Sequence, residues 1–243
     1  MDHVASPHTL LLDFDGVLSL NASELLLHAL HEGINRYTAF PFEATAAQFK
    51  AISTFPQRES LRTLFAGLGI ERHLDTEIEA LRSLISTDGR PMTLSEGVER
   101  FCAEQRARGR RLRVFSTMDR TTARRSLLDG LFDPEDFVPL GHASKADSHS
   151  YAAILSSQGE SGPGQVMLVD DSPLALRAAR IAGVRTVLMR GEVFTPEDVA
   201  PFAPFIEAQV ASFAELGDLL RSAEPPSVAR PSGPCADASP IPS

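Results

Sequence analysis

Two carboxylates separated by one residue follow a short apolar run near the start of the chain. Residues 10–12 are leucines and lead directly into Asp13, Phe14, Asp15 and Gly16. A short apolar run that ends in turn-forming residues predicts a buried strand of a parallel sheet, and ligands of such sheets bind at the carboxyl ends of the strands. Two carboxylates this close repel each other unless a cation or a shared proton offsets their charge. The pair therefore predicts a site for a hard divalent cation, most simply Mg²⁺, although the same residues can also close a turn without a ligand.

Polar residues also end two other apolar runs that are predicted to be strands. One run stops at Ser116 and Thr117, and another stops at Asp170 and Asp171. Lys145 follows a third, shorter run. Because the carboxyl ends of parallel strands meet at one edge of a sheet, we expect all these side chains to approach the first acidic pair. Four carboxylates, a lysine and two hydroxyls suit a phosphate group that is bridged by a cation.

Each of these clusters has a simpler explanation when it is taken alone. Ser116 and Thr117 can begin a helix, and Lys145 can be a solvated surface residue. The pair Asp170 and Asp171 can belong to the turn that enters a helix, since a proline follows shortly afterwards. A common site explains all of them together, which favours the functional interpretation.

Helical periodicity dominates the roughly seventy residues that follow Leu18. Leu25, Leu26 and Ala29 share one face of the first predicted helix, and Asn21 or Ser23 is placed to cap its start. No alternation typical of a strand interrupts this block. We therefore expect a helical insert, here called the cap, between the first and second strands.

From residue 94 onward, predicted strands and helices alternate, which indicates parallel βαβ units with right-handed crossovers. The predicted fold is α/β, with a Rossmann-like parallel sheet and a small α-helical cap inserted after the first strand. The core domain would comprise residues 1–18 and 92–223, and the cap residues 19–91. Residues 224–243 are rich in proline and serine, so we expect a disordered tail.

Composition narrows the class of protein. The 243-residue chain has 43% hydrophobic and 23% charged residues, which is typical of a globular protein. Its formal net charge of −9 argues against non-specific binding to nucleic acid. We expect no membrane span, because no apolar run approaches about 18 residues, and no signal peptide. The two cysteines, Cys102 and Cys235, give no disulfide framework and favour a reducing, cytoplasmic location.

With these motifs in order, the chain resembles the haloacid-dehalogenase-like hydrolase superfamily, in the branch that holds β-phosphoglucomutase and phosphoglycolate phosphatase. The matching motifs are residues 13–17 (DFDGV), residues 114–117 (VFST), Lys145 and residues 169–173 (VDDSP). The resemblance extends over about residues 8–220. The helical insert occupies the place of the small cap of that family.

The resemblance implies a role for each motif. Asp13 would be the nucleophile that forms an aspartyl-phosphate, and Asp15 would protonate the leaving oxygen and later activate water. Ser116, Thr117 and Lys145 would bind the phosphoryl oxygens.

The resemblance likewise implies a Mg²⁺ site. Its ligands would be Asp13, the backbone carbonyl of Asp15, and Asp171, with Asp170 as a further ligand or as a partner of the ligands. Because Asp15 is present, and the dehalogenases of the superfamily lack that second aspartate, cleavage of a carbon–halogen bond is disfavoured. A later acid of the family pattern is replaced here by Ala175.

Arg58 lies in a segment, residues 57–61 (QRESL), that is similar to the part of the cap in which relatives place a substrate-binding arginine. Its planar guanidinium can bind a second anionic group of a substrate, but Arg58 can equally be an exposed residue at the start of a helix.

Two positions in the segments expected to bind phosphate differ from the pattern of the family. Thr117 stands where relatives often have asparagine, and Ala146 follows Lys145 where proline is usual.

The expected function is that of a Mg²⁺-dependent phosphatase, which hydrolyses a small phosphorylated metabolite through an aspartyl-phosphate. One alternative is a phosphomutase acting on a sugar phosphate, and another is a phosphate-binding protein without catalysis. The expected partner is a phosphorylated small molecule, with no nucleic acid and no membrane, and the chain would be a monomer or a homodimer.

Overall fold

The fold is described from a computed structural model of the chain. The model describes residues 7–54, 57–87, 92–116, 127–138, 140, 143–157 and 163–223. The expected disorder of residues 224–243 and the expected role of Thr117 concern residues outside these ranges.

Six strands form one sheet in the order β3-β2-β1-β4-β5-β6, and every neighbouring pair is parallel. The chain runs outward from β1 to one side and then returns to β4 on the other side, so the order reverses between β1 and β4. That arrangement confirms the predicted Rossmann-like parallel sheet. The strands are β1 (Thr9–Leu12), β2 (Arg111–Phe115), β3 (Phe137–Val138), β4 (Val166–Asp170), β5 (Arg185–Met189) and β6 (Ala208–Val210).

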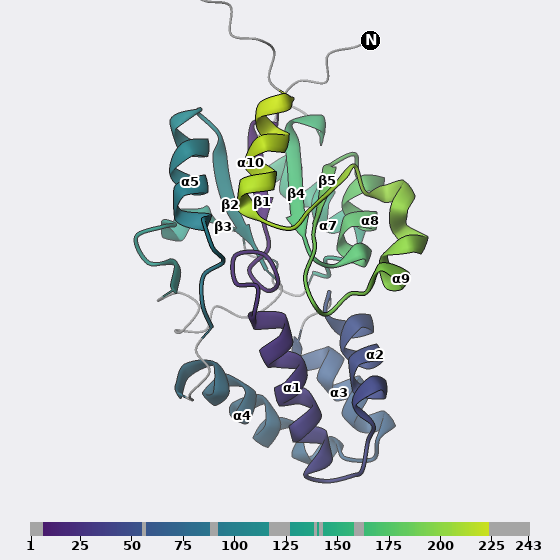
Figure 1. Cartoon of the computed structure of the whole chain (residues 1–243). Helices are drawn as coiled ribbons and strands as arrows, with labels where there is room; N and C mark the ends of the chain where they lie inside the picture. The colour runs from purple at the N-terminus through teal and green to yellow at the C-terminus, as the bar shows by residue number, and fades with distance from the viewer. Residues whose placement is uncertain are drawn as a thin grey trace, which may run out of the picture.

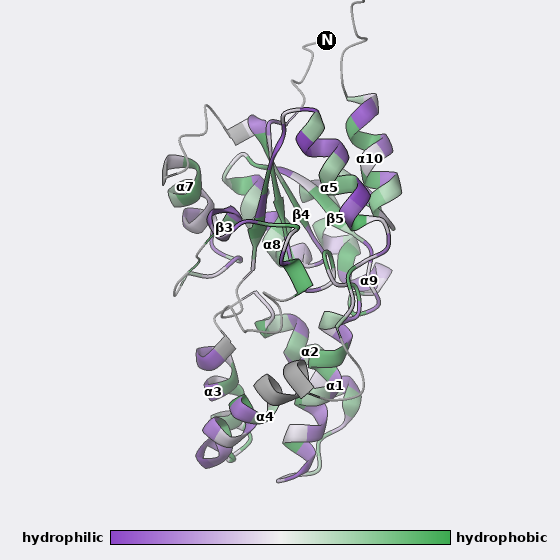
Figure 2. Cartoon of the chain, turned by 90° about the vertical axis from the view of Figure 1, so that its left-hand side faces the viewer, coloured by the Kyte–Doolittle hydropathy of each residue, from purple (hydrophilic) through white to green (hydrophobic). Residues whose placement is uncertain are grey.

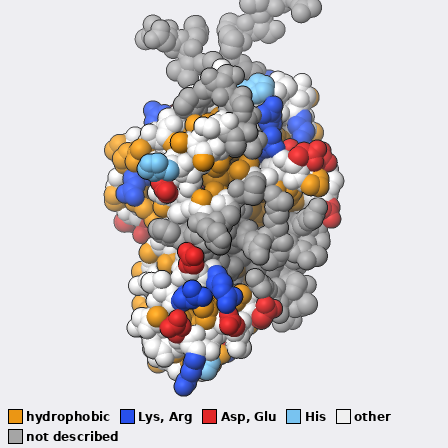
Figure 3. All heavy atoms as spheres, turned by 180° about the vertical axis from the view of Figure 1, so that it is seen from behind, with side chains coloured by type: hydrophobic (Ala, Val, Ile, Leu, Met, Phe, Trp, Pro, Cys, Tyr) orange, Lys and Arg blue, Asp and Glu red, His pale blue; other side chains and the backbone are white. Residues whose placement is uncertain are grey.

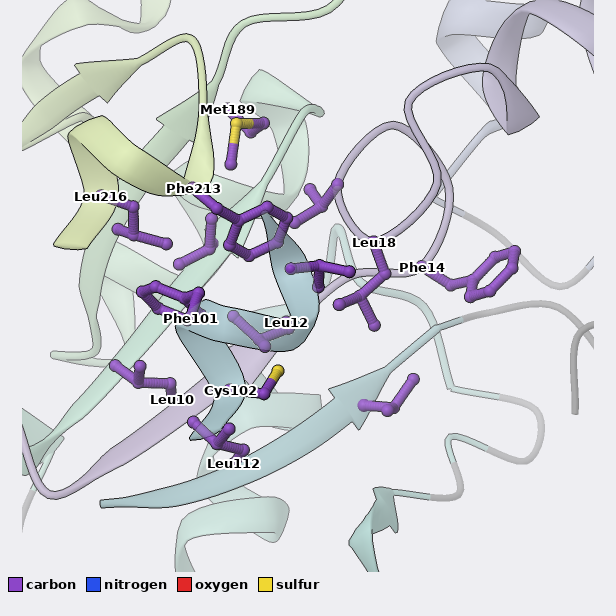
Figure 4. Packing of buried hydrophobic residues seen from close by; sticks show 14 of the residues in the cluster. Leu10, Leu12, Phe14, Leu18, Phe101, Cys102, Leu112, Met189, Phe213 and Leu216 are labelled. Atoms are coloured by element: carbon purple, nitrogen blue, oxygen red, sulfur yellow. The ribbon is translucent and has the colours of Figure 1, made fainter. Parts of the chain in front are cut away.

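Helices cover both faces of the sheet (Figure 1). Along β1, Leu10 and Leu12 join the core on one face, under α5 (Val98–Ala107) and α10 (Phe213–Ser222). The close-up of this core in Figure 4 shows Phe101 of α5 and Phe213 of α10 side by side, with ring centroids 5.0 Å apart. Burial on both faces explains why the central strands β1 and β4 are buried along their whole length and show no apolar–polar alternation before Asp170.

The opposite face of the sheet is covered by α7 (Ser148–Ser157) and α8 (Pro173–Ile181). Leu11 of β1 packs there with Tyr151 of α7 and Leu176 of α8. Shorter elements complete the core domain. They are α9 (Pro196–Val199) and the 3₁₀ turns η2 (Pro134–Asp136), η3 (Pro163–Gln165) and η4 (Ala200–Phe205). A further 3₁₀ turn, η1 (Glu71–His73), lies between two helices of the cap.

The cap consists of four helices between β1 and β2, as predicted for an insert at this point. In Figure 1 they lie together beyond the carboxyl ends of the strands, and Figure 2 shows hydrophobic and hydrophilic residues mixed along them. Their apolar faces form a separate small core around Ile34 and Phe65. No described helix is long and apolar enough to cross a membrane. The cap helices are α1 (Ala22–Asn35), α2 (Phe42–Ile52), α3 (Gln57–Gly67) and α4 (Leu74–Thr87).

The two connections between cap and core are hydrogen-bonded to each other. Of the two residues predicted to cap α1, Asn21 occupies the N-cap position, but its side chain forms no capping hydrogen bond. Its Oδ1 instead accepts from the Ser19 hydroxyl at 3.0 Å and from the Thr93 backbone amide at 3.1 Å. The Ser95 amide also donates to the Leu18 carbonyl at 2.8 Å. The Asn21 side chain thus bonds to the segment that leads from the cap back to the core, and not to the backbone amides at the start of α1. The domain boundaries at 18/19 and 91/92 stay a prediction.

An acidic side chain is buried inside the cap. Glu77 of α4 is 2% exposed, and its two oxygens accept from Arg36 Nη1 at 2.9 and 2.7 Å. The Tyr37 hydroxyl also donates to Glu77, at 2.8 Å. A Cβ atom at Gly33 would lie 2.5 Å from Glu77 Oε2, so the glycine lets this carboxylate lie close against α1. These contacts hold α1 and α4 together.

Replacing Glu77 by alanine should lower the free energy of unfolding by about 1–3 kcal/mol, because Arg36 and Tyr37 lose their shared acceptor. Denaturation in urea measures this loss. The matched control is Asp75→Ala on the same helix, where the side chain is 79% exposed and pairs with exposed Arg58. That change should cost no more than about 0.5 kcal/mol. Equal losses in the two variants would contradict a structural role for the buried pair.

Candidate active site

The acidic ends of β1 and β4 lie next to each other in the sheet. Leu12 pairs with Val169, so Asp13 and Asp170, which follow them, are level on neighbouring strands. The Asp13 amide donates to the Val169 carbonyl at 3.0 Å and continues the ladder by one step. This is the point at which the strand order reverses, where open α/β sheets bind ligands.

Lys145 reaches both of these carboxylates. Its Nζ atom lies 2.6 Å from Asp13 Oδ1 and 2.9 Å from Asp170 Oδ2, and the side chain is 3% exposed. The lysine backbone is also held, because its carbonyl accepts from the Tyr151 hydroxyl at 3.0 Å and its amide donates to the Thr54 carbonyl at 2.8 Å. The predicted approach of Lys145 to this edge is therefore seen, even though no proline follows it.

Asp171 completes the carboxylate cluster. Oxygens of Asp13, Asp170 and Asp171 all lie within 4.8 Å of one another, and all three residues are buried. The Ser23 hydroxyl of α1 donates to Asp171 Oδ2 at 3.2 Å. A Cβ atom at Gly16 would lie 2.0 Å from the same oxygen, and the φ of Gly16 is +76°. Glycine is thus required at this position both by the backbone and by the space that Asp171 fills.

Few opposite charges surround this buried cluster. Burial raises the pKa of Asp13 from 3.8 to about 8; the Lys145 ammonium lowers it, and the charges of Asp170 and Asp15 raise it further. Burial likewise raises the pKa of Asp171 well above its usual value, and Asp170 and Asp13 add to this effect. Burial alone would lower the pKa of Lys145, but the charges of Asp13 and Asp170 outweigh it and raise that pKa. One ammonium does not neutralise this set of carboxylates.

The donor set fits a hard divalent cation. Three carboxylates with oxygens this close, buried together and opposed by a single lysine, are the ligand type that Mg²⁺ prefers. A bound cation would supply the missing positive charge and favour the ionised forms of Asp13 and Asp171.

The structure places the other predicted site residues as follows. Asp15 is half-buried in the loop after β1, where its backbone forms an isolated β-bridge with Ser19. Its charge raises the pKa of Asp13 and of Asp171. Ser116 directly follows β2, at the same edge of the sheet. Arg58 is further out. Its guanidinium pairs with Asp75 at 2.6 Å, and both side chains are more than half exposed. On the face shown in Figure 3, basic and acidic side chains of the cap are likewise interspersed.

Sequence reasoning did not assign Ser23, Thr54 and Tyr151 to the site. Ser23 and Thr54 belong to the cap, and each touches the core across a long stretch of chain. No motif or spacing marks these contacts. Among the described residues, the buried hydroxyls of Thr54 and Ser172 have no hydrogen-bond partner.

Comparisons with known proteins agree with this fold. A family model described as haloacid dehalogenase-like hydrolase matches residues 10–189. A search of curated proteins gives no match. Among solved structures, a putative β-phosphoglucomutase from Bacteroides vulgatus is 14% identical, with a TM-score of 0.72 and coverage of 90% of each chain.

Two structures of CbbY from Rhodobacter sphaeroides are also similar, and each comparison covers 87% of this chain and 96% of that chain. The structure in complex with phosphate is 22% identical with a TM-score of 0.67. A mutant in complex with xylulose-(1,5)bisphosphate is 20% identical with a TM-score of 0.66. At these identities the likeness shows a shared fold.

Stabilisation by Mg²⁺ should depend on pH. Between the ordinary Asp pKa of 3.8 and the folded value of about 8 for Asp13, the folded chain holds more protons than the unfolded chain. The free energy of unfolding that this group contributes therefore falls as pH rises through that range. A Mg²⁺ ion at this cluster would have to displace those protons and would therefore bind more weakly at low pH.

At a Mg²⁺ concentration about a hundredfold above its Kd at pH 8, we expect Tm to rise by about 5–10 °C at pH 8, and by less than half as much at pH 5. Thermal melts with Mg²⁺ and with a chelator measure the two shifts. Asp171→Asn is the control and should reduce the shift at both pH values. Equal shifts at pH 5 and pH 8 in the unaltered chain would contradict cation binding by this cluster.

Proposed function

Because the chain belongs to the haloacid dehalogenase-like hydrolases, we propose that it is a Mg²⁺-dependent phosphatase that hydrolyses monoesters of small phosphorylated metabolites through a phosphorylated Asp13. The observation that carries this proposal is the buried cluster of Asp13, Asp170 and Asp171 at the switch point of the sheet, in which Lys145 pairs with Asp13 and Asp170. Binding of phosphate alone would not need a buried carboxylate at the position of attack.

Asp13 is held in a geometry that suits a nucleophile. Its Oδ1 accepts from Lys145 Nζ at 2.6 Å and from the Phe14 amide at 2.7 Å. Both contacts go to the same oxygen, so we assign attack on phosphorus to Oδ2. In that step the new bond joins Asp13 Oδ2 to phosphorus, and the bond from phosphorus to the leaving oxygen breaks.

Asp15 is the acid and base of the proposed reaction. It is less buried than Asp13, two residues further along the loop. Its carboxyl gives a proton to the leaving alkoxide, and the resulting carboxylate then takes a proton from the attacking water. The water oxygen bonds to phosphorus, the Asp13–phosphorus bond breaks, and phosphate leaves. Asp15 ends the cycle protonated, as it began.

Positive charge and donors for the phosphoryl group come from several elements. Lys145 stands beside the attacking carboxylate, and we propose that its ammonium, the Ser116 hydroxyl and the Thr117 amide bind phosphoryl oxygens. Asp13, the Asp15 carbonyl, Asp171 and Asp170 would hold Mg²⁺. When bound, this cation supplies positive charge beside the transferring group and neutralises the carboxylates.

The cap is proposed to cover the substrate. The Thr54 carbonyl accepts from the Lys145 amide at 2.8 Å and from the Ser144 hydroxyl at 2.9 Å. Lys50 of α2 also pairs with Asp198 of the core at 2.5 Å. These contacts hold the cap against the core, and those of Thr54 lie beside Lys145. In this position the cap can exclude water and contact the leaving group.

The experiment is a screen of sugar phosphates, phosphoglycolate, nucleotides and phosphorylated cofactors, with and without Mg²⁺. Asp13→Asn should lower turnover of any substrate found by at least about a thousandfold, because it removes the nucleophile. The fold should persist, since asparagine keeps the size and can still accept from Lys145. Asp218→Asn, at a side chain 75% exposed on α10, is the matched control and should keep full activity.

Release of free phosphate decides between the candidate reactions. If the chain isomerises a sugar phosphate supplied with its bisphosphate and releases no free phosphate, the proposed activity is that of a phosphomutase and not of a hydrolase. No turnover across the whole panel would instead favour a phosphate-binding protein without catalysis. Full activity of Asp13→Asn would contradict the nucleophile assignment.

Arg58 is proposed to contact a second anionic group of the substrate. The exposed pair with Asp75 is weak and can exchange for a ligand. Arg58→Ala should raise KM about tenfold for substrates with a second anionic group and leave KM of singly phosphorylated neutral compounds unchanged. Asp75→Ala, which removes the competing carboxylate, should not raise KM. An equal effect of Arg58→Ala on both substrate classes would contradict this role.

A further inference from the structure

We propose that Ser23, on the first turn of cap helix α1, is a positioning residue that orients the Asp171 carboxylate for binding the cation. The inference rests on the proposed function, because it assigns Asp171 to the Mg²⁺ site. Its basis is the hydrogen bond from the Ser23 hydroxyl to Asp171 Oδ2 at 3.2 Å, which joins residues 148 positions apart. Ser23 is 5% exposed and Asp171 is 7% exposed, so water does not compete freely for this contact.

The hydroxyl of Ser23 does not serve its own helix. A serine near the start of a helix commonly bonds to a nearby backbone group. Here the residue at the cap position is Asn21, and the Ser23 hydroxyl donates across the boundary between cap and core. Because this hydroxyl forms its hydrogen bond with a buried carboxylate of the core and not with the backbone of α1, we assign it a role in holding that carboxylate.

Asp171 is also confined by the loop after β1. Because a Cβ atom at Gly16 would lie 2.0 Å from Asp171 Oδ2, the backbone of Gly16 passes directly against that oxygen. Oδ2 is therefore bounded by Gly16 of the core and hydrogen-bonded by Ser23 of the cap. Rotation of the carboxylate would break the hydrogen bond and bring the group against the loop. Such outer partners hold a ligand in the orientation that a metal requires.

The cap end of this contact is itself fixed. Ser23 lies two residues after Asn21, whose side chain bonds to both Ser19 and Thr93 and so joins the two connections between cap and core. The start of α1 is thus held where the cap meets the core. Ser23 presents its hydroxyl from an anchored point, which is the property that a positioning residue needs.

Mg²⁺ affinity without substrate tests the proposal, measured by calorimetric titration of the full chain. Ser23→Ala should weaken binding about tenfold, the effect expected for loss of a partner of a metal ligand. Ser23→Thr retains the hydroxyl and should bind within about twofold of the unaltered chain. The matched control is Thr45→Val, which removes a buried hydroxyl that bonds to His31 and Pro41 within the cap. It should leave Mg²⁺ affinity unchanged.

The outcomes separate this inference from the proposed function. Unchanged affinity in Ser23→Ala, with clear binding to the unaltered chain, overturns the role of Ser23 alone. Equal weakening in Ser23→Ala and Thr45→Val also overturns it, since a general loss of stability would then explain both. An unaltered chain that binds no Mg²⁺ overturns the metal site and the inference together. Weakening in Ser23→Ala that Ser23→Thr restores supports the positioning role.

Discussion

The rest of the structure depends on one electrostatic constraint, the burial of several carboxylates around a single ammonium. Oxygens of Asp13, Asp170 and Asp171 lie within 4.8 Å of one another, and Lys145 pairs with Asp13 and Asp170. Burial, together with the neighbouring carboxylates, raises the pKa of Asp13 to about 8. A protein retains such a group of like charges only where something offsets them, either protons or a cation. The same excess of negative charge that destabilises the bare cluster makes it a strong ligand set. Stability and function are therefore opposed at this point of the fold.

The parallel sheet makes this burial possible. Because β1 lies between β2 and β4, the polar residues that follow all three strands come to one edge, and the switch point falls between the two most acidic ends. The apolar strands bury both faces under helices, so the edge is the part of the sheet left for polar groups. Gly16 allows the loop after β1 to pass against Asp171 and so closes the cluster from the side.

The cap contributes more than a cover. The Thr54 carbonyl bonds to the backbone of Lys145, and the Ser23 hydroxyl bonds to Asp171, so two groups of the cluster are each held partly from the cap. A shift of the cap would therefore alter the environment of the lysine and of a proposed metal ligand. This links the element proposed to contact the substrate with the element proposed to bind the cation.

Local sequence determined the elements and their chemistry. Apolar runs, turn residues and helical periodicity identified the parallel sheet, the helical cap after the first strand and the acidic ends of β1 and β4, because these depend on residues close together in the chain. The tertiary structure alone decided which partners these residues have. Ser23 and Thr54 form hydrogen bonds across the cap boundary, and the Asn21 side chain bonds to Thr93 and forms no capping bond. Each of these joins segments far apart in sequence, and the position of a donor relative to a distant acceptor is set by packing, which no local pattern encodes.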